Sequence, residues 1–447
     1  MGRDSLTRRE FLTLIGAGSA AIATSGGLAG IAEGAKPSRK PNIVVILADD
    51  LGYGELGMQG NKEIPTPNID SIAANGVRFT NGYVTCPVCS PTRAGLATGR
   101  YQQRFGHEVN PGLPGTEAEN FGLPLSETIF ASRLKSAGYA TGAVGKWHLG
   151  FRPELMPLKR GFDEFFGFLD GGMYYMGERP EGARGIMRNN DPVEESEYLT
   201  DAFGREAKAF IEKHKDEPFF LYLAFNAVHS PLQITQKYLD RFPHIQDEKR
   251  RKYAGMTSAM DDAIGRTLSA IRDNGLENDT LIIFLSDNGG PTGETTSSNG
   301  PLKGGKGIVY EGGVRIPYCM QWKGKLPAGA LYDKPVISLD IAPTALAAAG
   351  VKAPDAKFDG VNLLPYLKKG ANKGNPHDAL YWRIGSMRAI RKGDWKLAKL
   401  KPTMTELYNL KDDIGETTDL AARNPEKVKE LTDQLMKWDS ELAKPLW

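Results

Sequence analysis

The chain carries the sequence NIVVILADD at residues 42–50, and this stretch decides the fold class. Its apolar run is unbroken and rich in β-branched side chains, which is typical of a parallel strand buried on both faces. The run stops at two adjacent carboxylates, Asp49 and Asp50, and a glycine-rich loop follows them. Open α/β sheets bind ligands at such carboxyl ends of strands.

Three further runs have the same form. They lie at 281–286, ending before Asp287 and Asn288; at 219–225, near His229; and at 140–144, ending at Gly145 and Lys146. Helical periodicity separates the strands at 126–137, 200–214 and 253–274. This alternation predicts an α/β fold, a large mainly parallel sheet sandwiched by helices. We expect the strand ends to bring Asp, Asn, Lys and His side chains to one edge.

The pattern changes after about residue 360. Short segments at 379–383, 387–392, 395–400 and 406–409 are separated by tight turns, which predicts antiparallel strands. An amphipathic helix is expected at 425–442. We therefore predict a catalytic domain at 36–360 and a small C-terminal α+β subdomain, a sheet plus a helix, at 361–447.

The first 35 residues have the composition of an export signal. TRREFL at residues 7–12 resembles the twin-arginine motif, and a stretch rich in Gly, Ala, Ser and Thr follows at 12–31. Because that stretch is only weakly hydrophobic, a cleaved signal is favoured over a transmembrane anchor. We expect export through the twin-arginine translocase, a periplasmic or secreted protein, and no membrane partner for the mature form.

Charge and cysteine content narrow the classes of protein. Of 447 residues, 56 are Lys or Arg and 54 are Asp or Glu, and a formal net charge of +2 gives no indication of binding to nucleic acid. Cys86, Cys89 and Cys319 are too few for a disulfide framework. Cys86 and Cys89 have the spacing of a redox pair, but the thioredoxin-like context is missing.

Oxygen ligands gather at two of the predicted strand ends. Three carboxylates and one amide, from Asp49, Asp50, Asp287 and Asn288, suit a hard divalent cation, Ca2+ more readily than Zn2+, with Mg2+ as an alternative. Helix capping would explain a single such residue. Paired polar residues at two strand ends favour a metal site instead.

Residues 89–100, CSPTRAGLATGR, contain Cys-x-Pro-x-Arg followed by Thr-Gly-Arg. This segment resembles the signature of formylglycine-dependent (type I) sulfatases of the alkaline-phosphatase-like superfamily, in which the pattern marks a cysteine for oxidation. Five residues alone could match by chance. Companion segments also resemble the family, most of all its bacterial carbohydrate and aryl sulfatases. They lie at 41–54, 66–70, 145–150, 286–289, 302–307, 310–317, 391–397 and 406–410.

The resemblance implies a sulfuric ester hydrolase whose nucleophile is a formylglycine hydrate, made from Cys89 by a formylglycine-generating maturation enzyme. One hydroxyl of such a hydrate attacks sulfur and the other expels sulfate, so the nucleophile carries its own means of release. The modified Cys89 would join Asp49, Asp50, Asp287 and Asn288 around Ca2+.

The resemblance also assigns roles to five basic side chains. Arg93 would steady the hydrate, while Lys146 and Lys306 would bind sulfate oxygens. His148 would bond the hydrate, and His229 would bind substrate and protonate the leaving oxygen. A lone histidine is more often structural and a lone lysine is usually solvated, but the motifs around these residues favour function.

The segment 167–190 is long, polar and aromatic. Its candidates for substrate binding are Asp170 and Tyr174 first, with Tyr175, Arg179, Arg184 and Arg188. Such side chains stack on sugar rings or bind their polar groups, although an ordinary surface loop has the same composition. His107 and Asn110 are second-rank candidates in another loop. The expected substrate is a sulfated saccharide, for instance a sulfated polysaccharide, or an aryl sulfate.

Two other functions stay open. A phosphonate or phosphate monoester hydrolase on the same fold also uses formylglycine, so the signature does not exclude it. A chain whose Cys89 is not converted would be a non-catalytic saccharide-binding protein.

Overall fold

The computed structural model describes residues 39–110, 121–177, 184–368, 370–371 and 374–447, and the chain from residue 39 onward forms one compact unit. The predicted export signal at 1–35 lies outside the described residues. The domain boundary near residue 360 stays a prediction.

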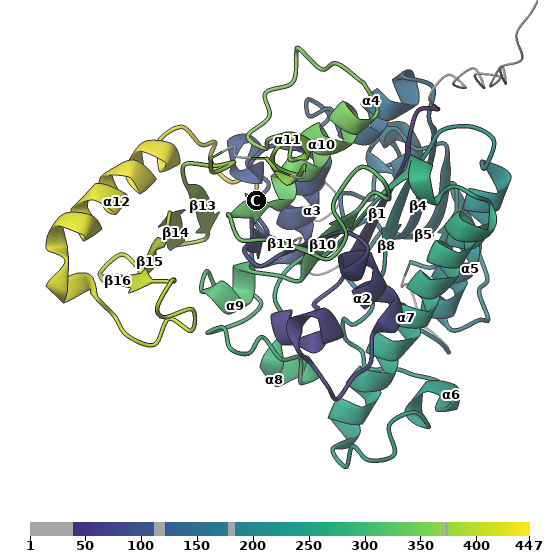
Figure 1. The fold of residues 1–447 in the computed structure, drawn as a ribbon, viewed down its shortest axis with the longest axis horizontal. Coiled ribbons are helices and arrows are strands. Elements are labelled where there is room, and N and C mark those ends of the chain that lie inside the picture. The colour runs from purple at the N-terminus through teal and green to yellow at the C-terminus, as the bar shows by residue number, and fades with distance from the viewer. Residues whose placement is uncertain (1–38, 111–120, 178–183, 369, 372–373) are drawn as a thin grey trace, which may run out of the picture. The chain divides into compact units, whose positions relative to one another are not determined.

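Ten strands of the described chain form one sheet, in the order β11-β2-β10-β9-β1-β8-β4-β5-β6-β7. Figure 1 labels β1, β8, β4 and β5 of this sheet, with helices around them. Its centre is parallel and consists of β9 (Thr280–Ser286), β1 (Asn42–Ala48), β8 (Phe219–Ala224), β4 (Ala140–Lys146) and β5 (Glu164–Phe168). Four of these are the strands predicted from apolar runs. The expected α/β class with a mainly parallel sheet is confirmed.

Short strands that the sequence pattern did not predict make both edges of the sheet. On one side β10 (Tyr318–Gln321) runs antiparallel to β9 and to β2 (Val77–Phe79), and β11 (Ala330–Tyr332) follows. On the other side β6 (Ile186–Arg188) and β7 (Asp191–Val193) form an antiparallel pair beside β5. Strands of three or four residues are too short to show a recognisable period.

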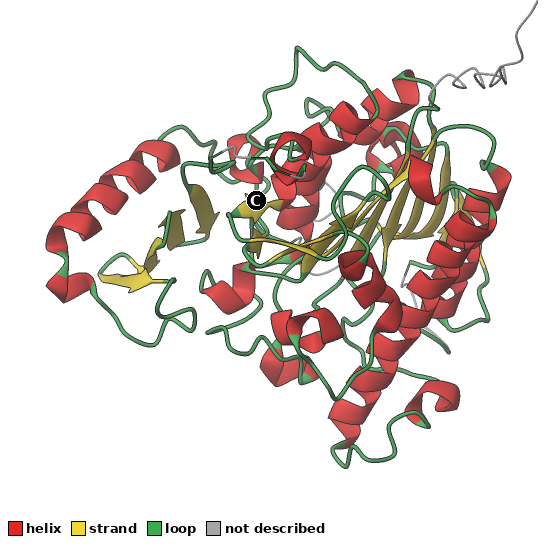
Figure 2. Ribbon diagram, viewed as in Figure 1, coloured by secondary structure: helices red, strands yellow, loops and turns green. Residues whose placement is uncertain are grey.

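Side chains of β1 alternate between two hydrophobic cores, one on each face of the sheet. Residues 44, 46 and 48 pack in the core that includes α2 (Pro67–Ala74), α5 (Leu199–Lys213) and α7 (Glu248–Asp273). Residues 43, 45 and 47 pack in the core that includes α3 (Cys89–Thr98), α4 (Phe130–Ser136) and α10 (Ile341–Ala348). Helices therefore cover both faces, as Figure 2 shows. Each fully buried aliphatic side chain contributes about 1.5–3 kcal/mol.

Two helices begin away from their predicted starts, each for a local reason. α7 starts at Glu248, earlier than residue 253, because the Asp247 carboxylate accepts from the Arg250 amide at 2.6 Å and caps the helix. α4 starts at Phe130, later than residue 126, where the Glu127 carbonyl accepts from Arg160 Nη2 at 2.7 Å instead of from a helical amide.

The C-terminal part forms the expected antiparallel sheet and helix. Its elements are β13 (Leu380–Ile384), β14 (Met387–Lys392), β15 (Trp395–Lys401), β16 (Met404–Asn409) and α12 (Pro425–Asp439). Trp382 Nε1 donates to the Val84 carbonyl at 2.7 Å and ties this sheet to the rest of the unit.

Several 3-10 turns connect the elements, and the remaining strands and α-helices of the described chain are short. They are β3 (Gly82–Tyr83) paired with β12 (Val336–Ile337), and helices α6 (Gln236–Leu239), α8 (Thr292–Thr295), α9 (Glu311–Val314) and α11 (Leu364–Leu367). Among the described helices, none combines the length and the apolar character needed to cross a bilayer.

Candidate active site

The carboxyl ends of β1 and β9 lie side by side because the two strands pair in register, with Ala48 opposite Ser286. The residues that follow each strand therefore meet. The Asp50 amide donates to Asp287 Oδ1 at 3.2 Å, and Asn288 Nδ2 donates to Asp50 Oδ1 at 2.7 Å. Asp49, Asp50, Asp287 and Asn288 are fully buried, so the structure brings all four predicted metal ligands together.

This cluster has the donor chemistry of a site for a hard cation. Its three carboxylates are fully buried from solvent, and Asn288 Oδ1 is buried with no hydrogen-bond partner in the described residues. Burial and the negative charge of Asp49 raise the pKa of Asp287. A divalent ion would satisfy the amide oxygen and relieve the repulsion, so the residues present fit the predicted metal.

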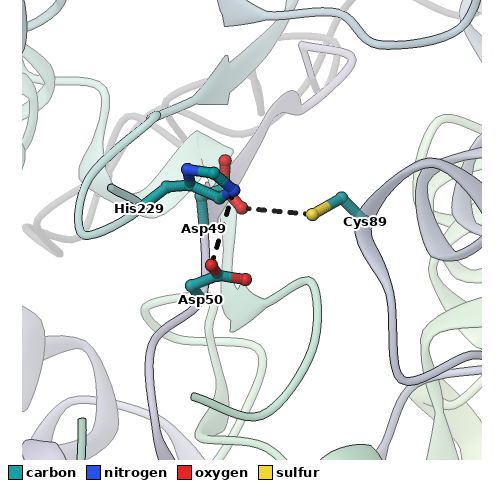
Figure 3. Close-up of side chains that lie close together, drawn as sticks. All are labelled: Asp49, Asp50, Cys89 and His229. Atoms are coloured by element: carbon teal, nitrogen blue, oxygen red, sulfur yellow. Dashed lines mark hydrogen bonds and ion pairs between the residues drawn. The ribbon is translucent and has the colours of Figure 1, made fainter. Parts of the chain in front are cut away.

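Cys89 begins α3 and points into the same cluster (Figure 3). Its Sγ lies 3.5 Å from Asp49 Oδ1, and one atom from each of Asp49, Asp50, Cys89 and His229 falls within 4.8 Å of the others. Burial raises the pKa of the Cys89 thiol. Cys86 is also free and buried, and its Sγ faces the Glu108 carbonyl at 3.9 Å, so the two thiols form no disulfide.

Arg93 lies one helical turn after Cys89 and is fully buried. Its Nε and Nη2 donate to Asp287 Oδ2 at 3.0 and 2.8 Å, and its Nη1 donates to the Lys146 carbonyl at 3.1 Å. The guanidinium thus joins α3 to the ends of β9 and β4.

Two ammonium groups balance the carboxylates. Lys146, the last residue of β4, donates to Asp49 Oδ2 at 2.6 Å, and Lys306 donates to Asp50 Oδ2 at 2.8 Å. Burial would raise the pKa of Asp49, but the Lys146 ammonium and other nearby cations lower it overall. The site is therefore a buried group of alternating charges, which holds anions and cations in fixed places.

Lys306 reaches the site from a glycine-rich loop at 303–313. The Gly307 amide donates to the Pro87 carbonyl at 2.8 Å, two residues before Cys89. The loop also packs on Gly289, where an added Cβ would lie 1.7 Å from the Gly312 carbonyl oxygen. Only glycine permits this approach, which explains the glycines next to Asn288 and in the loop.

The two predicted histidines differ in the hydrogen bonding of their rings. His229 Nδ1 lies 2.6 Å from the Ser230 carbonyl oxygen, and since a carbonyl only accepts, Nδ1 carries a hydrogen and Nε2 faces Asp50 Oδ2 at 3.6 Å. Burial and the charges of Lys146 and Arg93 hold the pKa of His148 well below its ordinary value. His148 Nδ1 is buried without a hydrogen-bond partner among the residues described.

Asp170 and Tyr174, the substrate candidates of segment 167–190, belong to a loop beside the histidines rather than to the charged cluster. Asp170 pairs with Arg184 at 2.7 Å, and the Tyr174 side chain is 39% exposed. Between them, a Cβ at Gly171 would lie 2.8 Å from His148 Nε2, and one at Gly172 would lie 3.5 Å from His229 Cε1. The loop therefore runs along both histidines. Of the other side chains of this segment, Arg188 pairs with Glu206, and Arg179 lies outside the described residues.

The sequence indicated His107 and Asn110 as second-rank candidates for substrate binding, but it did not predict the contacts by which they support the site. Ser90 Oγ donates to the His148 carbonyl at 2.6 Å and lies 2.7 Å from His107 Nε2, and the Ser90 amide donates to Asn110 Oδ1 at 2.9 Å. His107 and Asn110 thus contact the residue after Cys89. Tyr175 is buried beneath His229, and no local pattern distinguishes it from exposed Tyr174.

Comparisons with known proteins cover almost all of this architecture. Residues 41–351 match the Sulfatase family model, and residues 305–444 match the model described as N-sulphoglucosamine sulphohydrolase, C-terminal. The N-acetylgalactosamine-6-sulfatase of Mus musculus is 35% identical over 380 residues, which are 80% of this chain and 71% of that one.

Solved structures agree with these sequence matches. Ps i-CgsB in complex with k-i-k-neocarrahexaose superposes with a TM-score of 0.86 at 38% identity, covering 92% of this chain and 95% of that chain. The PsFucS1 sulfatase from Pseudoalteromonas sp. has a TM-score of 0.77 at 26% identity, with 90% of each chain covered.

Proposed function

The chain belongs to the sulfatase family of sulfate ester hydrolases, and we propose that it desulfates a saccharide with a formylglycine hydrate made from Cys89 and a bound Ca2+. The observation that carries the proposal is the position of Cys89, whose Sγ lies 3.5 Å from Asp49 Oδ1. A nucleophile placed there would lie within a buried group of three carboxylates and three cationic side chains.

A formylglycine hydrate at position 89 would supply one hydroxyl that attacks sulfur and a second that expels sulfate, while Ca2+ would supply positive charge. The chain's own residues hold these groups. Asp49, Asp50, Asp287 and the free Asn288 Oδ1 would bind the ion. His148 Nδ1, which is unpartnered among the described residues, would accept a hydrogen bond from the hydrate.

The charge that develops on the sulfuryl oxygens needs cations that are already in place. Lys146 and Lys306 donate hydrogen bonds to the carboxylates of Asp49 and Asp50. Both ammonium groups would also bind the sulfuryl oxygens. Arg93, fixed by Asp287 and the Lys146 carbonyl, would steady the hydrate at the start of α3.

His229 would protonate the leaving oxygen. Its Nδ1–H is held by the Ser230 carbonyl, so the proton that leaves the imidazolium is the one on Nε2, which faces the site. This step matters most for sugar sulfates, because a sugar alkoxide is a poor leaving group.

A sulfated saccharide is the proposed substrate class. One related structure is described in complex with k-i-k-neocarrahexaose, and one sequence relative is named N-acetylgalactosamine-6-sulfatase. Tyr174 offers an exposed ring and Asp170 a carboxylate beside the two histidines, which suits the apolar faces and hydroxyl groups of a sugar. We further propose that the chain is exported through the twin-arginine translocase and acts in the periplasm or outside the cell.

The test uses the exported full chain produced with a formylglycine-generating enzyme. The mass of the peptide that contains residue 89 reports conversion, and rates are measured on sulfated mono- and oligosaccharides and on the sulfate and phosphate esters of one aryl alcohol. We expect sulfated saccharides to be cleaved and the aryl sulfate to react faster than the aryl phosphate.

The matched variants are Cys89→Ala and Cys86→Ala, which each remove one buried thiol. C89A should lose at least about 10⁴-fold in kcat, as removal of a covalent nucleophile does, while C86A keeps its rate. Activity of C89A, or preference for the phosphate ester, would contradict the mechanism. Cleavage of aryl sulfates but of no saccharide would contradict the substrate class.

A further inference from the structure

Tyr175 is fixed directly beneath the turn that carries His229. Its hydroxyl lies 2.6 Å from the Asn226 carbonyl oxygen and 2.8 Å from the His229 carbonyl oxygen. The side chain is 1% exposed and stacks on Tyr198 with ring centroids 5.7 Å apart. Its amide donates to Gln233 Oε1 at 2.8 Å, so both backbone and ring are immobilised.

The two carbonyls are the two ends of the His229 turn. The His229 amide donates to the Asn226 carbonyl at 2.8 Å, and the two lone pairs of that oxygen let it also accept from Tyr175. The single hydrogen of the Tyr175 hydroxyl is shared between the Asn226 and His229 carbonyls. Beyond the adjacent Ser230 carbonyl and Asp50, no described group bonds the imidazole. The aim of the ring therefore depends on the turn. Backbone bonds of Ala227 and Val228 with Asp49 hold the middle of this turn, and the Tyr175 hydroxyl contacts the carbonyls at its two ends.

We propose that Tyr175 is a positioning residue that holds His229 Nε2 toward the leaving oxygen of the substrate. The inference rests on the proposed role of His229 as the general acid. Burial raises the pKa of Tyr175 well above its ordinary value, so the phenol remains a hydrogen-bond donor across the working pH range.

The same loop carries the proposed substrate residues. Tyr174 is exposed next to Tyr175, and Gly172 packs on His229. One rigid segment therefore connects the saccharide-binding face to the proton donor, and a displaced Tyr175 would disturb proton transfer before it disturbs the charged cluster around Cys89.

The test is the Tyr175→Phe variant, which keeps the ring and removes the hydroxyl. Loss of a buried hydrogen bond of about 1–2 kcal/mol corresponds to about a five- to thirtyfold loss of rate. We expect this loss in kcat for a sulfated saccharide, and less than about twofold for 4-nitrophenyl sulfate, whose leaving group needs little protonation. A merely structural effect would lower both rates alike.

Tyr198→Phe is the matched control, because it removes a hydroxyl from the stacked neighbour, which donates to the Gln233 carbonyl and not to the His229 turn. Y198F should leave the ratio of the two rates unchanged. Should Y175F fold poorly, Gln233→Ala frees the Tyr175 amide from the other side and should show the same selectivity.

The His229→Ala variant distinguishes the proposed general-acid role of His229 from the positioning role of Tyr175. If H229A loses selectively on the saccharide but Y175F does not, the inference about Tyr175 is overturned and the proposed general acid stands. If H229A loses equally on both substrates, His229 is not the general acid and both proposals fall.

Discussion

Ser90 shows how one hydroxyl next to the proposed nucleophile, Cys89, holds the backbone of His148. It donates its single hydrogen to the His148 carbonyl, so His107 must donate to Ser90 Oγ from Nε2. His148 has a φ of 57°, a left-handed conformation that costs of order 1–3 kcal/mol and persists because contacts such as the Ser90 bond hold it. Burial lowers the pKa of His107 to about 3, so its ring stays neutral in this role.

Replacing His107 by Leu should therefore lower kcat by about tenfold, because it leaves the buried Ser90 hydroxyl without its donor. His107→Gln can still donate an N–H and should stay within about threefold of the parent. The difference should persist from pH 5 to 9, since a group with a pKa near 3 does not titrate there. Rates are divided by the formylglycine content from peptide mass. Equal rates for H107L and the parent would refute the support role.

At this scale the sequence predicts which charged and polar side chains form the site, but not the residues that support them. The acids, lysines and histidines of the cluster follow from motifs and strand ends, and the structure brings them together. The bond between Ser90 and His107 and the burial of Tyr175 depend on tertiary packing, to which local patterns do not respond.

Among the elements, β15 and α9 meet through a buried charge group behind the Lys306 loop. Lys396 Nζ lies 2.8 Å from Glu311 Oε1 and 3.0 Å from Glu416 Oε1, and all three side chains are fully buried. Burial raises the pKa of Glu416 to about 7, with Lys396 opposing and Glu311 reinforcing the shift. Because one ammonium faces two buried carboxylates, one of the two, Glu416, favours the protonated form.

The sign of the pH effect follows from this raised pKa. The folded protein retains a proton on Glu416 between pH 4.5 and about 7 that the unfolded chain releases, so stability falls as pH rises through this window. The loss is on the order of 3 kcal/mol, and Glu416→Gln should remove it. Urea midpoints of E416Q and the parent at pH 5, 6 and 7 measure the difference.

Glu426→Gln, at an exposed position on α12, is the matched control and should follow the parent. Parallel pH slopes for E416Q and the parent would show that Glu416 is ionised in the folded state throughout. The pH dependence of stability arises from the contact between β15 and α9. The sequence motifs at 391–397 and 310–317 are recognisable separately, but nothing local indicates that Lys396 and Glu311 meet.

For the whole molecule, the proposed metal site joins distant parts of the chain. Asp50 and Asn288 are 238 residues apart and meet because β1 and β9 are neighbours in the sheet. The rule that parallel strands present ligands at their carboxyl edge was enough to predict this convergence. The rule says nothing of the short strands near the two edges, such as β2, β6 and β11, whose pairing is set by their neighbours rather than by their own three residues.

A cation bound there should stabilise the whole unit, because it binds the folded chain and not the separated segments. At one hundred times its dissociation constant, a ligand contributes about 2.7 kcal/mol, which for a chain of this size raises Tm by about 3–5 °C. We expect protein stripped with a chelator to recover this shift with Ca2+, and to a smaller extent with equal Mg2+. Asp50→Asn should abolish the shift, while Asp412→Asn, an exposed acid, should preserve it. An unchanged Tm on adding Ca2+, or a full response in D50N, would show that these carboxylates do not form the ion site.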